Sequence, residues 1–239
     1  MTALSFSPAT VILRPTVLAC QQIDLVDTQL AANLGLDGRR HACAGLLTCD
    51  QDDALYIALD EATKQAAVDV VFARSFYAGS KHASGPYSGE IMGILAGQTP
   101  DDVTEGLWAA REHLRAVVGF RSFVGEPWTS RGGPAFLAEV IAEVGRYLAP
   151  QAGIAAGEPM AYLIAPPLEA TVGVDAALKA ADVRLAKWIP PPSETNFAGA
   201  FVTGQLGDLL AARDAFVGAI HDVGSAPLRA ARRPDRLRR

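Results

Sequence analysis

The sequence predicts an α+β protein in which one structural unit occurs twice. The chain has 239 residues, which suits two domains of about 110 residues each. Two short strings recur at nearly one spacing: Glu-Ala-Thr begins at positions 61 and 169, and Gly-Gln begins at positions 97 and 204. Each string lies between an apolar β-type run and a helix-compatible stretch. Offsets of 108 and 107 positions in the same context indicate a duplication.

Each copy is expected to contain a strand, a helix, a strand or hairpin, another strand and a closing helix, with the helices on one side of a sheet. In the first copy we predict strands over 43–48, 54–59 and 90–96, a helix-compatible stretch up to 71, and a helix over 101–117. In the second copy we predict strands over 160–165 and 199–203, and helices over 172–182 and 206–223. Residues 119–157 are expected to supply the second copy's leading elements, around a helix near 135–148. The predicted domains are therefore 1–118 and 119–226, followed by a basic tail at 227–239.

The composition favours assembly and argues against nucleic-acid binding. Half of the residues are hydrophobic, a fifth are charged, and the mean hydropathy is +0.18, which is apolar for a protein surrounded by water. The net charge is −5 although residues 228–239 hold six arginines and one aspartate, so the body of the chain is strongly acidic. An acidic body is a poor partner for DNA or RNA. Burial of apolar surface between copies of the chain explains this composition most simply.

The cysteines and the apolar segments predict a cytoplasmic protein. The three cysteines include no C-x-x-C pair, and an odd number cannot form a closed set of disulfides, which suits a reducing compartment. No run approaches about 18 uninterrupted apolar residues, so we expect no membrane-spanning helix.

Four long strings carry a family resemblance. They are GEPMAYLIAPPLEATVGVDAALKAADV from Gly157, IPPPSETNF from Ile189, DEATKQA from Asp60 and RSFYAG from Arg74. Over nearly the whole chain they resemble the EutL type of ethanolamine-utilisation microcompartment shell proteins. The second copy also resembles the single-domain microcompartment shell unit, whose strand and helix lead into a pore loop. Trp188 and Phe197 depart from the tyrosines usual in the family, and the arginine-rich tail is an addition.

The resemblance implies an architecture and a location. It implies two tandem, circularly permuted bacterial microcompartment (BMC) shell domains per chain, and three chains in a pseudohexamer. Such trimers would pack edge to edge with other shell proteins into a protein shell around an enzyme pathway. A closed ring of head-to-tail contacts needs no partner beyond further copies of the chain. The implied function is a structural, pore-bearing tile of a microcompartment, without enzymatic activity.

The acidic turn Asp50-Gln51-Asp52-Asp53 is a candidate for a small pore. By itself such a turn is usually a solvated loop whose carboxylates bond their own backbone. In EutL-type proteins the matching residues surround a narrow channel within each subunit, so the resemblance assigns Asp52, Asp53, Glu90 and Phe120 to that channel. Clustered carboxylates attract cations, and an aromatic face adds cation–π attraction. A protonated amine such as ethanolamine fits this description.

Two polar loops, 77–89 and 190–196, are candidates for a central pore. Sequence alone is equally compatible with plain surface loops, but on the shell unit both loops approach the symmetry axis. The residues assigned to the central pore or its gate are Tyr77, Gly79, Ser80, Lys81, His82, Ser193, Glu194, Thr195 and Asn196. The first loop is rich in glycine and the second contains three consecutive prolines, so we expect the first to be the gate and the strand at 54–59 to stay fixed.

Other chemistries have less support. The alternation of side chains along a strand places His41, Cys43 and Cys49 on one face, where they could bind zinc together. Isolated thiols, however, are usually buried and pack like small apolar side chains. Cys20 has no local motif that would pair it with His113 or His221 as a nucleophile, and no P-loop, G-x-S-x-G or G-x-G-x-x-G string occurs. We therefore expect no metal, no cofactor and no catalysis. The alternative to a shell tile is a soluble trimeric protein that senses an amine or a larger cofactor with the same acidic pocket.

Overall fold

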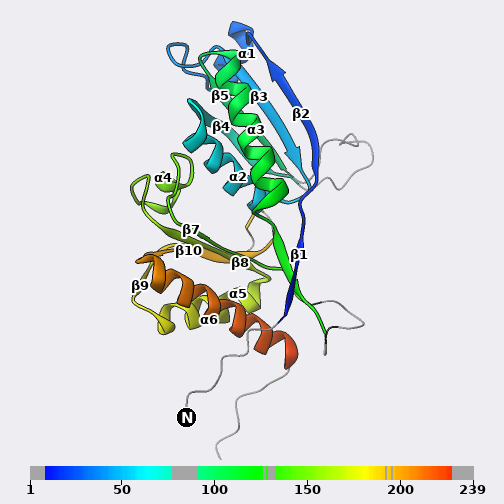
Figure 1. The fold of residues 1–239 in the computed structure, drawn as a ribbon, viewed down its shortest axis with the longest axis vertical. Helices are drawn as coiled ribbons and strands as arrows, with labels where there is room; N and C mark the ends of the chain where they lie inside the picture. The colour runs from blue at the N-terminus through cyan, green and yellow to red at the C-terminus, as the bar shows by residue number, and fades with distance from the viewer. Residues whose placement is uncertain are drawn as a thin grey trace, which may run out of the picture.

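The computed structural model describes residues 9–76, 91–125, 128, 133–191, 193–194 and 196–227, which form two α+β units (Figure 1). The first unit contains a four-stranded antiparallel sheet with the strand order β2-β3-β5-β4. Helices α2 and α3 pack on one face of this sheet. The elements of the unit are β2 (Val17–Ile23), α1 (Thr28–Leu34), β3 (Cys43–Cys49), α2 (Asp52–Gln65), β4 (Val68–Ser75), β5 (Ile91–Gly97) and α3 (Pro100–Ala116).

The second unit repeats this order of elements, which confirms the predicted duplication. Its antiparallel sheet has the order β7-β8-β10-β9, and helices α5 and α6 cover one face. Its elements are β7 (Leu137–Ile141), α4 (Leu148–Ala152), β8 (Met160–Ala165), α5 (Pro167–Ala180), β9 (Val183–Ile189), β10 (Ala198–Gly204) and α6 (Leu206–Ser225). In chain order, each sheet therefore places its second and fourth strands in the centre, as a duplicated unit requires.

A two-stranded ribbon lies beside the units. Strand β1 (Thr10–Leu13) pairs antiparallel with β6 (Phe120–Phe123), and one further bridge joins Arg121 to Phe136 just before β7. The segment that enters the first unit is thus hydrogen-bonded to the segment that enters the second. The predicted boundary after residue 118 stays a prediction, because β6 pairs with the N-terminal strand and belongs to neither four-stranded sheet.

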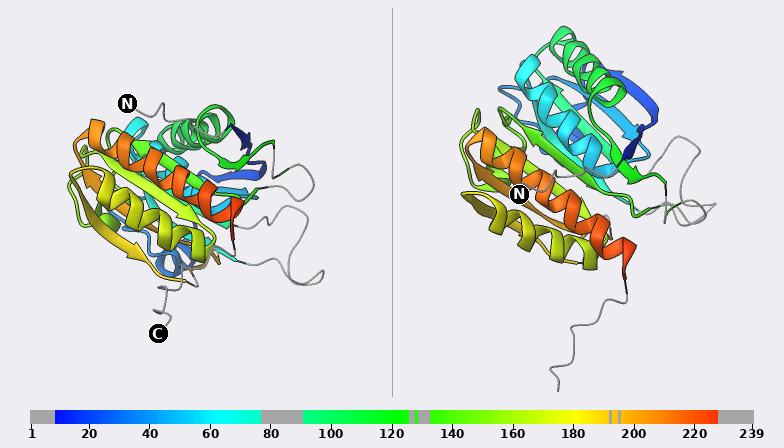
Figure 2. Two further views of the ribbon diagram at one scale, coloured as in Figure 1. Left: turned by 90° about the horizontal axis from the view of Figure 1, so that it is seen from below. Right: turned by 60° about the horizontal axis from the view of Figure 1, so that its bottom comes forward.

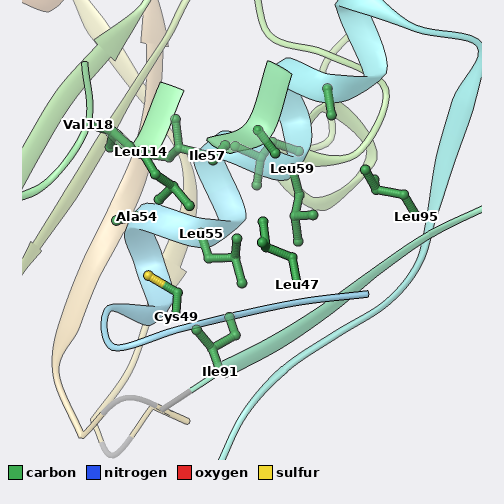
Figure 3. Close-up of a cluster of buried hydrophobic side chains, with 14 of the residues drawn as sticks. Leu47, Cys49, Ala54, Leu55, Ile57, Leu59, Ile91, Leu95, Leu114 and Val118 are labelled. Atoms are coloured by element: carbon green, nitrogen blue, oxygen red, sulfur yellow. The ribbon is translucent and has the colours of Figure 1, made fainter. Parts of the chain in front are cut away.

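Helix α2 is packed between the two sheets, so the units share a hydrophobic core (Figure 2). Leu47, Leu55 and Leu95 contribute to this core from the first unit (Figure 3), and Met160 and Phe201 contribute from the second. The second sheet is therefore covered on both faces, by α2 on one side and by α5 and α6 on the other. Burial of apolar surface stabilises a protein by about 25 cal/mol per Å², so this shared core strongly favours one arrangement of the two units.

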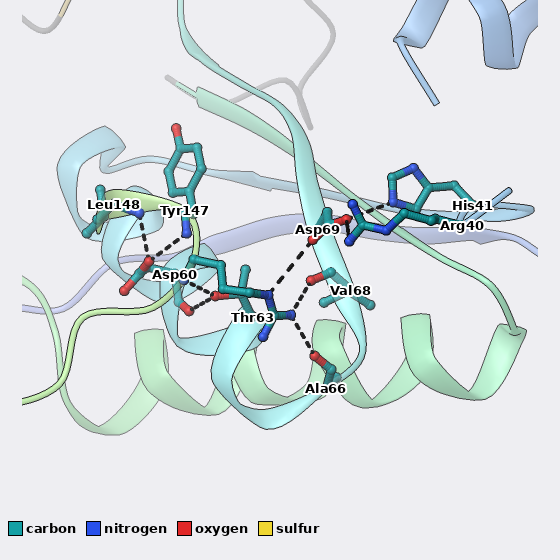
Figure 4. A network of polar contacts seen from close by, with 10 residues as sticks. Arg40, His41, Asp60, Thr63, Ala66, Val68, Asp69, Tyr147 and Leu148 are labelled. Atoms are coloured by element: carbon teal, nitrogen blue, oxygen red, sulfur yellow. Dashed lines mark hydrogen bonds and ion pairs between the residues drawn. The ribbon is translucent and has the colours of Figure 1, made fainter. Parts of the chain in front are cut away.

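A buried carboxylate fixes the junction between the units (Figure 4). Asp60, which is 1% exposed on α2, accepts backbone N–H groups from Gly145 at 2.6 Å, Tyr147 at 3.1 Å and Leu148 at 2.8 Å. Burial raises the pKa of the Asp60 carboxyl, and the three N–H donors oppose that rise. A Cβ on Gly145 would lie 2.5 Å from the carbonyl oxygen of Asp60, so this close approach requires glycine.

Arg146 extends the same junction. Its guanidinium donates to the carbonyl oxygens of Ala66 at 3.3 Å and Val68 at 2.9 Å, where α2 turns into β4. It also lies 3.9 Å from the carboxylate of Asp69, which Arg40 contacts at 2.5 Å. Four consecutive residues of the second unit thus bind polar groups of the first.

Some predicted elements are confirmed. The strands at 43–48, 90–96, 160–165 and 199–203 correspond to β3, β5, β8 and β10, and the helices at 101–117 and 206–223 correspond to α3 and α6. Helix α3 begins where the sequence encodes it: Thr99 and Asp102 form a capping box, and Pro100 occupies the first turn. The helix expected over 172–182 starts five residues earlier, at Pro167.

Two predicted elements are wrong. Residues 54–59 lie inside α2 and form no strand, so the expected fixed strand does not exist. The sequence of this segment resembles a β-strand because α2 is buried on two sides, by its own sheet and by the second unit. The helix therefore lacks the polar positions that a surface helix has. Residues 137–141, expected within a helix at 135–148, form β7, which pairs with β8 along its full length. That pairing is a tertiary contact and overrides the helix propensity of the segment.

The duplication is real, but one of the two strings that indicated it does not align structurally. Glu61 lies late in α2, whereas Glu169 lies in the first turn of α5. The first residues of the two helices, Asp52 and Pro167, are 115 positions apart. The ends of β5 and β10, Gly97 and Gly204, are 107 positions apart, as the Gly-Gln match indicated. The difference arises because the segment between β4 and β5 is longer than its counterpart between β9 and β10.

Replacing Asp60 with asparagine should lower the free energy of unfolding by about 1–3 kcal/mol, because an amide leaves at least one buried N–H without an acceptor. Urea unfolding followed by circular dichroism measures the change. Asp175→Asn is the matched control: Asp175 holds the equivalent position of α5, is exposed, and pairs with Lys179 at 2.6 Å, so the change should stay within about 0.5 kcal/mol. Equal losses in both variants would contradict the assigned role of Asp60.

Candidate functional site

The predicted small-pore carboxylates occupy the first turn of α2. Acidic residues are favoured there because the N-terminus of a helix carries a partial positive charge. Asp52 is half-buried; its Oδ1 accepts the N–H of Asp53 at 3.0 Å and its Oδ2 accepts the hydroxyl of Ser75 at 2.8 Å. Ser75 ends β4, so Asp52 holds the strand that leads into the predicted gate segment.

Asp53 belongs to the junction between the units. Its side chain is only 3% exposed, and its Oδ1 accepts the hydroxyl of Tyr162 from β8 at 2.5 Å. Burial, and then the charge of Asp53, raise the pKa of Tyr162 well above its usual range, so the phenol remains a donor. The sequence pattern does not show this contact, because the partners are 109 positions apart.

Phe120 lies near these carboxylates but its ring is covered. Its backbone N–H donates to the side chain of Gln51 at 3.0 Å, which places it beside the start of α2. The ring is 5% exposed and stacks on Phe197, with 5.5 Å between the ring centroids. In this structure the ring of Phe120 therefore packs against a second aromatic ring.

A tyrosine that the sequence pattern did not indicate joins the two predicted pore loops. Tyr56, on α2, accepts the N–H of Ser75 at 3.1 Å and donates its hydroxyl to Glu194 at 3.1 Å. Ser75 lies just before the segment 77–90, and Glu194 lies between β9 and β10. The predicted small-pore residue Asp52 and the predicted central-pore residue Glu194 are thus linked through Ser75 and Tyr56.

The loop that carries Glu194 is a compact turn in its described part. Ser193 donates its N–H to the carbonyl of Phe197 at 3.2 Å, and Asn196 donates its N–H to the carbonyl of Ser193 at 3.1 Å. Asn196 has a φ of 60°, in the left-handed region where asparagine is tolerated better than most residues. These contacts agree with the expectation of a stiff second loop.

Asp53, Ser193 and Glu194 line one cavity of about 420 Å³ between the two units. Its walls are largely aromatic and its charges are mixed: Arg74 and Lys187 face it together with the two carboxylates. The remaining lining residues are Tyr56, Ala73, Tyr147, Gln151, Tyr162, Trp188, Ile189, Pro190 and Phe201. One predicted small-pore residue, Asp53, therefore shares a cavity with two predicted central-pore residues, whereas Asp52 and Phe120 do not line it.

Seven predicted site residues lie outside the described residues. They are Tyr77, Gly79, Ser80, Lys81, His82, Glu90 and Thr195. Their assignment to the gate and to the pores stays a prediction, as does the position of the basic tail at 228–239.

The zinc and nucleophile alternatives gain no support from the geometry. His41 faces Asp69, with 3.0 Å between its Nε2 and the carboxylate. Burial raises the pKa of Cys49 to about 12 and also raises the pKa of Cys20 and Cys43, so these thiols stay protonated. Within the described part of the chain, no group of three or more histidines, cysteines and acids could hold a metal ion. Among the same residues, no helix is long and apolar enough to cross a membrane.

Comparison with known proteins decides the family. No protein-family model matches the sequence. The chain is 45% identical over 225 residues to the bacterial microcompartment shell protein EutL of Escherichia coli strain K12. This match covers 94% of this chain and 100% of the relative. It is 46% identical over 217 residues to EutL of Clostridium perfringens, spanning 91% of this chain and 97% of the relative. The chain belongs to the EutL family.

Solved structures agree with this placement in the EutL family. The crystal structure of the ethanolamine utilization protein EutL from Leptotrichia buccalis matches with a TM-score of 0.84 and 45% identity, covering 92% of this chain and 99% of that one. The trimeric shell protein PduB matches with a TM-score of 0.66 at 18% identity, which shows the fold. The α+β tandem BMC-domain fold expected from the sequence is confirmed, and members of the EutL family are structural shell proteins rather than enzymes.

The buried tyrosines of the site predict a loss of stability in alkali. Burial raises the pKa of Tyr147 from 10.0 to about 12, and it also raises the pKa of Tyr56 and Tyr162. Above pH 10 the unfolded chain loses these protons while the folded chain keeps them, so the free energy of unfolding should fall steadily up to about pH 12. Urea unfolding at intervals between about pH 9 and about pH 12 measures the slope. Tyr147→Phe should flatten it, and an unchanged slope would exclude Tyr147 as a cause.

Proposed function

We propose that the chain is a structural tile of an ethanolamine-utilisation microcompartment, in which three copies close a ring that carries small pores and a central pore. The observation that carries the proposal is identity of 45% to EutL proteins over 94% of the chain, together with a shared core that holds the two BMC units as one body. The ring would consist of six similar units, and head-to-tail contacts would close it. The neighbouring tiles would be other shell proteins.

The small pores would admit a protonated amine such as ethanolamine. Asp52 supports this role, because its carboxylate is half-buried at the start of α2 and accepts hydrogen bonds from two neutral groups, the hydroxyl of Ser75 and the N–H of Asp53. Asp53 is buried beside it and adds negative potential. A carboxylate can accept a charge-assisted hydrogen bond from an ammonium group. Glu90 and Phe120 complete the proposed lining.

The central pore would be bordered by the segments 77–89 and 190–196. Tyr56 supports a connection between them, since it bonds Ser75, which lies just before the first segment, and Glu194 in the second. The glycine-rich first segment is proposed as the gate, and the proline-rich second segment as its fixed edge.

The assembly is tested by light scattering and electron microscopy. The chain mass is 25.1 kDa, and a trimer should give about three times that mass at micromolar concentration. Overexpression should yield sheets, tubes or closed shells. A stable monomer would contradict the ring, while discrete trimers that never form larger arrays would favour the alternative of a soluble amine or cofactor sensor.

Amine binding is tested by calorimetry with ethanolamine. Because a pore must release what it admits, we expect a Kd near the millimolar range, about 4 kcal/mol of binding free energy, which weakens as salt is added. Asp52→Asn and Glu90→Gln should each reduce binding several-fold while the oligomer stays intact. Asp101→Asn on the exposed start of α3 removes the same charge away from the pore and serves as the control. Unchanged binding in the first two variants would remove these residues from the site.

A further inference from the structure

We infer that the cavity between α6, β7 and the β1–β6 ribbon binds a small zwitterion of the amino-acid kind, with a carboxylate at one end and an ammonium group at the other. The cavity measures about 250 Å³ and shares no lining residue with the cavity of Asp53 and Glu194. It is lined by Thr10, Arg121, Phe136, Ala138, Glu139, Arg213, Asp214 and Val217. A space of this size suits a small metabolite rather than a large cofactor.

Glu139 is a charged group in this cavity that packing alone does not explain. It lies on β7, and its Oε1 is buried without a hydrogen-bond partner among the described residues. Burial raises the pKa of the Glu139 carboxyl, while the charges of Arg121 and Arg213 oppose that rise. A buried carboxylate oxygen is unfavourable unless a donor reaches it. The Glu139 carboxylate therefore offers an acceptor to a donor from outside the chain.

Two guanidinium groups line the same cavity. Arg121 lies on β6, and its side chain makes no hydrogen bond or ion pair within the described part of the chain. Arg213 lies on α6 and bonds its neighbour Asp214 at 2.7 Å. A guanidinium has five N–H donors and binds a carboxylate through two of them, so both arginines can bind the anionic end of a ligand. Glu139 also borders a cavity of about 170 Å³, where Asp60 and Glu61 would repel such an anion.

The first unit lacks these charges at two equivalent positions. Counted across the sheets from β5 and β10, whose ends match, Gln21 on β2 is the equivalent of Glu139 and is exposed. The buried residues Val103, Gly106, Ala110 and Leu114 of α3 match Leu209, Ala212, Phe216 and Ile220 of α6, each 106 positions later. Leu107, which is 6% exposed, is therefore the equivalent of Arg213. The duplicated fold thus requires neither charge, and both are particular to the second unit.

The cavity and the proposed small pore lie on opposite faces of β6. Arg121 follows Phe120 in this strand, and successive side chains of a strand point to opposite faces. Phe120 packs in the core that the two units share, whereas Phe123, on the same face as Arg121, packs in the core beneath α6. A ligand that binds Arg121, Glu139 and Arg213 would join the ribbon to β7 and α6. It should therefore stabilise the folded chain.

The inference is tested by urea unfolding with β-alanine and γ-aminobutyrate, two zwitterions of different length. At least one of them should raise the urea midpoint as its concentration rises, because a ligand that binds only the folded state stabilises it. Propionate keeps the carboxylate but lacks the ammonium group, so it should need about ten-fold more ligand for the same shift. Ethanolamine lacks the carboxylate, and any shift that it causes through the proposed small pore should be equal in the native chain and in the variants of this cavity.

Glu139→Gln and Arg213→Leu give the second unit the residue types of the first, so both variants should fold, as circular dichroism will show. Each should weaken zwitterion binding about ten-fold or more, because each removes one of the charges that the ligand meets. Glu143→Gln and Arg184→Leu remove the same charges from exposed positions and should keep the native shift.

Three results would overturn the assigned site: no shift with either zwitterion, a shift that propionate reproduces at equal concentration, or a native shift retained in either cavity variant. Loss of ethanolamine binding together with a preserved zwitterion shift would instead contradict the small pore alone.

Discussion

The junction between the two units is the constraint on which the rest of the structure depends. Asp60 holds three backbone N–H groups of the segment 145–148, and Arg146 holds the carbonyl groups that follow α2. A buried carboxylate is costly unless donors surround it, so Asp60 can be buried here only because the segment 145–148 supplies its N–H groups. The junction therefore couples the folding of one unit to that of the other. This coupling explains why α2 is buried on nearly every side.

The candidate site is a product of this junction. Asp53 and Tyr162 come from different units, as do Tyr56 and Glu194, and the cavity that they line lies between the units. Neither unit alone would place a carboxylate opposite a phenol at this point. Tyr56 bonds Ser75 at the end of β4 and Glu194 between β9 and β10, so the positions of these two residues depend on the position of α2. A single-domain relative would have to obtain the same contacts from a neighbouring chain.

The sequence predicts the duplicated α+β plan well and the junction poorly. Strands such as β8 and helices such as α3 carry their own signals, namely an apolar run or a capping box with proline. The sequence predicts a strand within α2 because the second unit buries the positions that are polar in a surface helix. It predicts a helix at β7 because the pairing of β7 with β8, a tertiary contact, overrides the local propensity. The acceptor role of Asp60 could not be predicted, since its donors are 85 to 88 positions away.

Amide hydrogen exchange at Gly145, Tyr147 and Leu148 tests most directly whether the two units act as one body. These three amides lie in the connection between β7 and β8, and amides without a stable acceptor in such connections ordinarily exchange fast. If Asp60 accepts all three, they should exchange as slowly as the amides of β8 in the shared core, and Asp60→Asn should accelerate them selectively. Rapid exchange at these positions in the native chain, alongside full protection of β8, would show that the units open independently and would contradict the account.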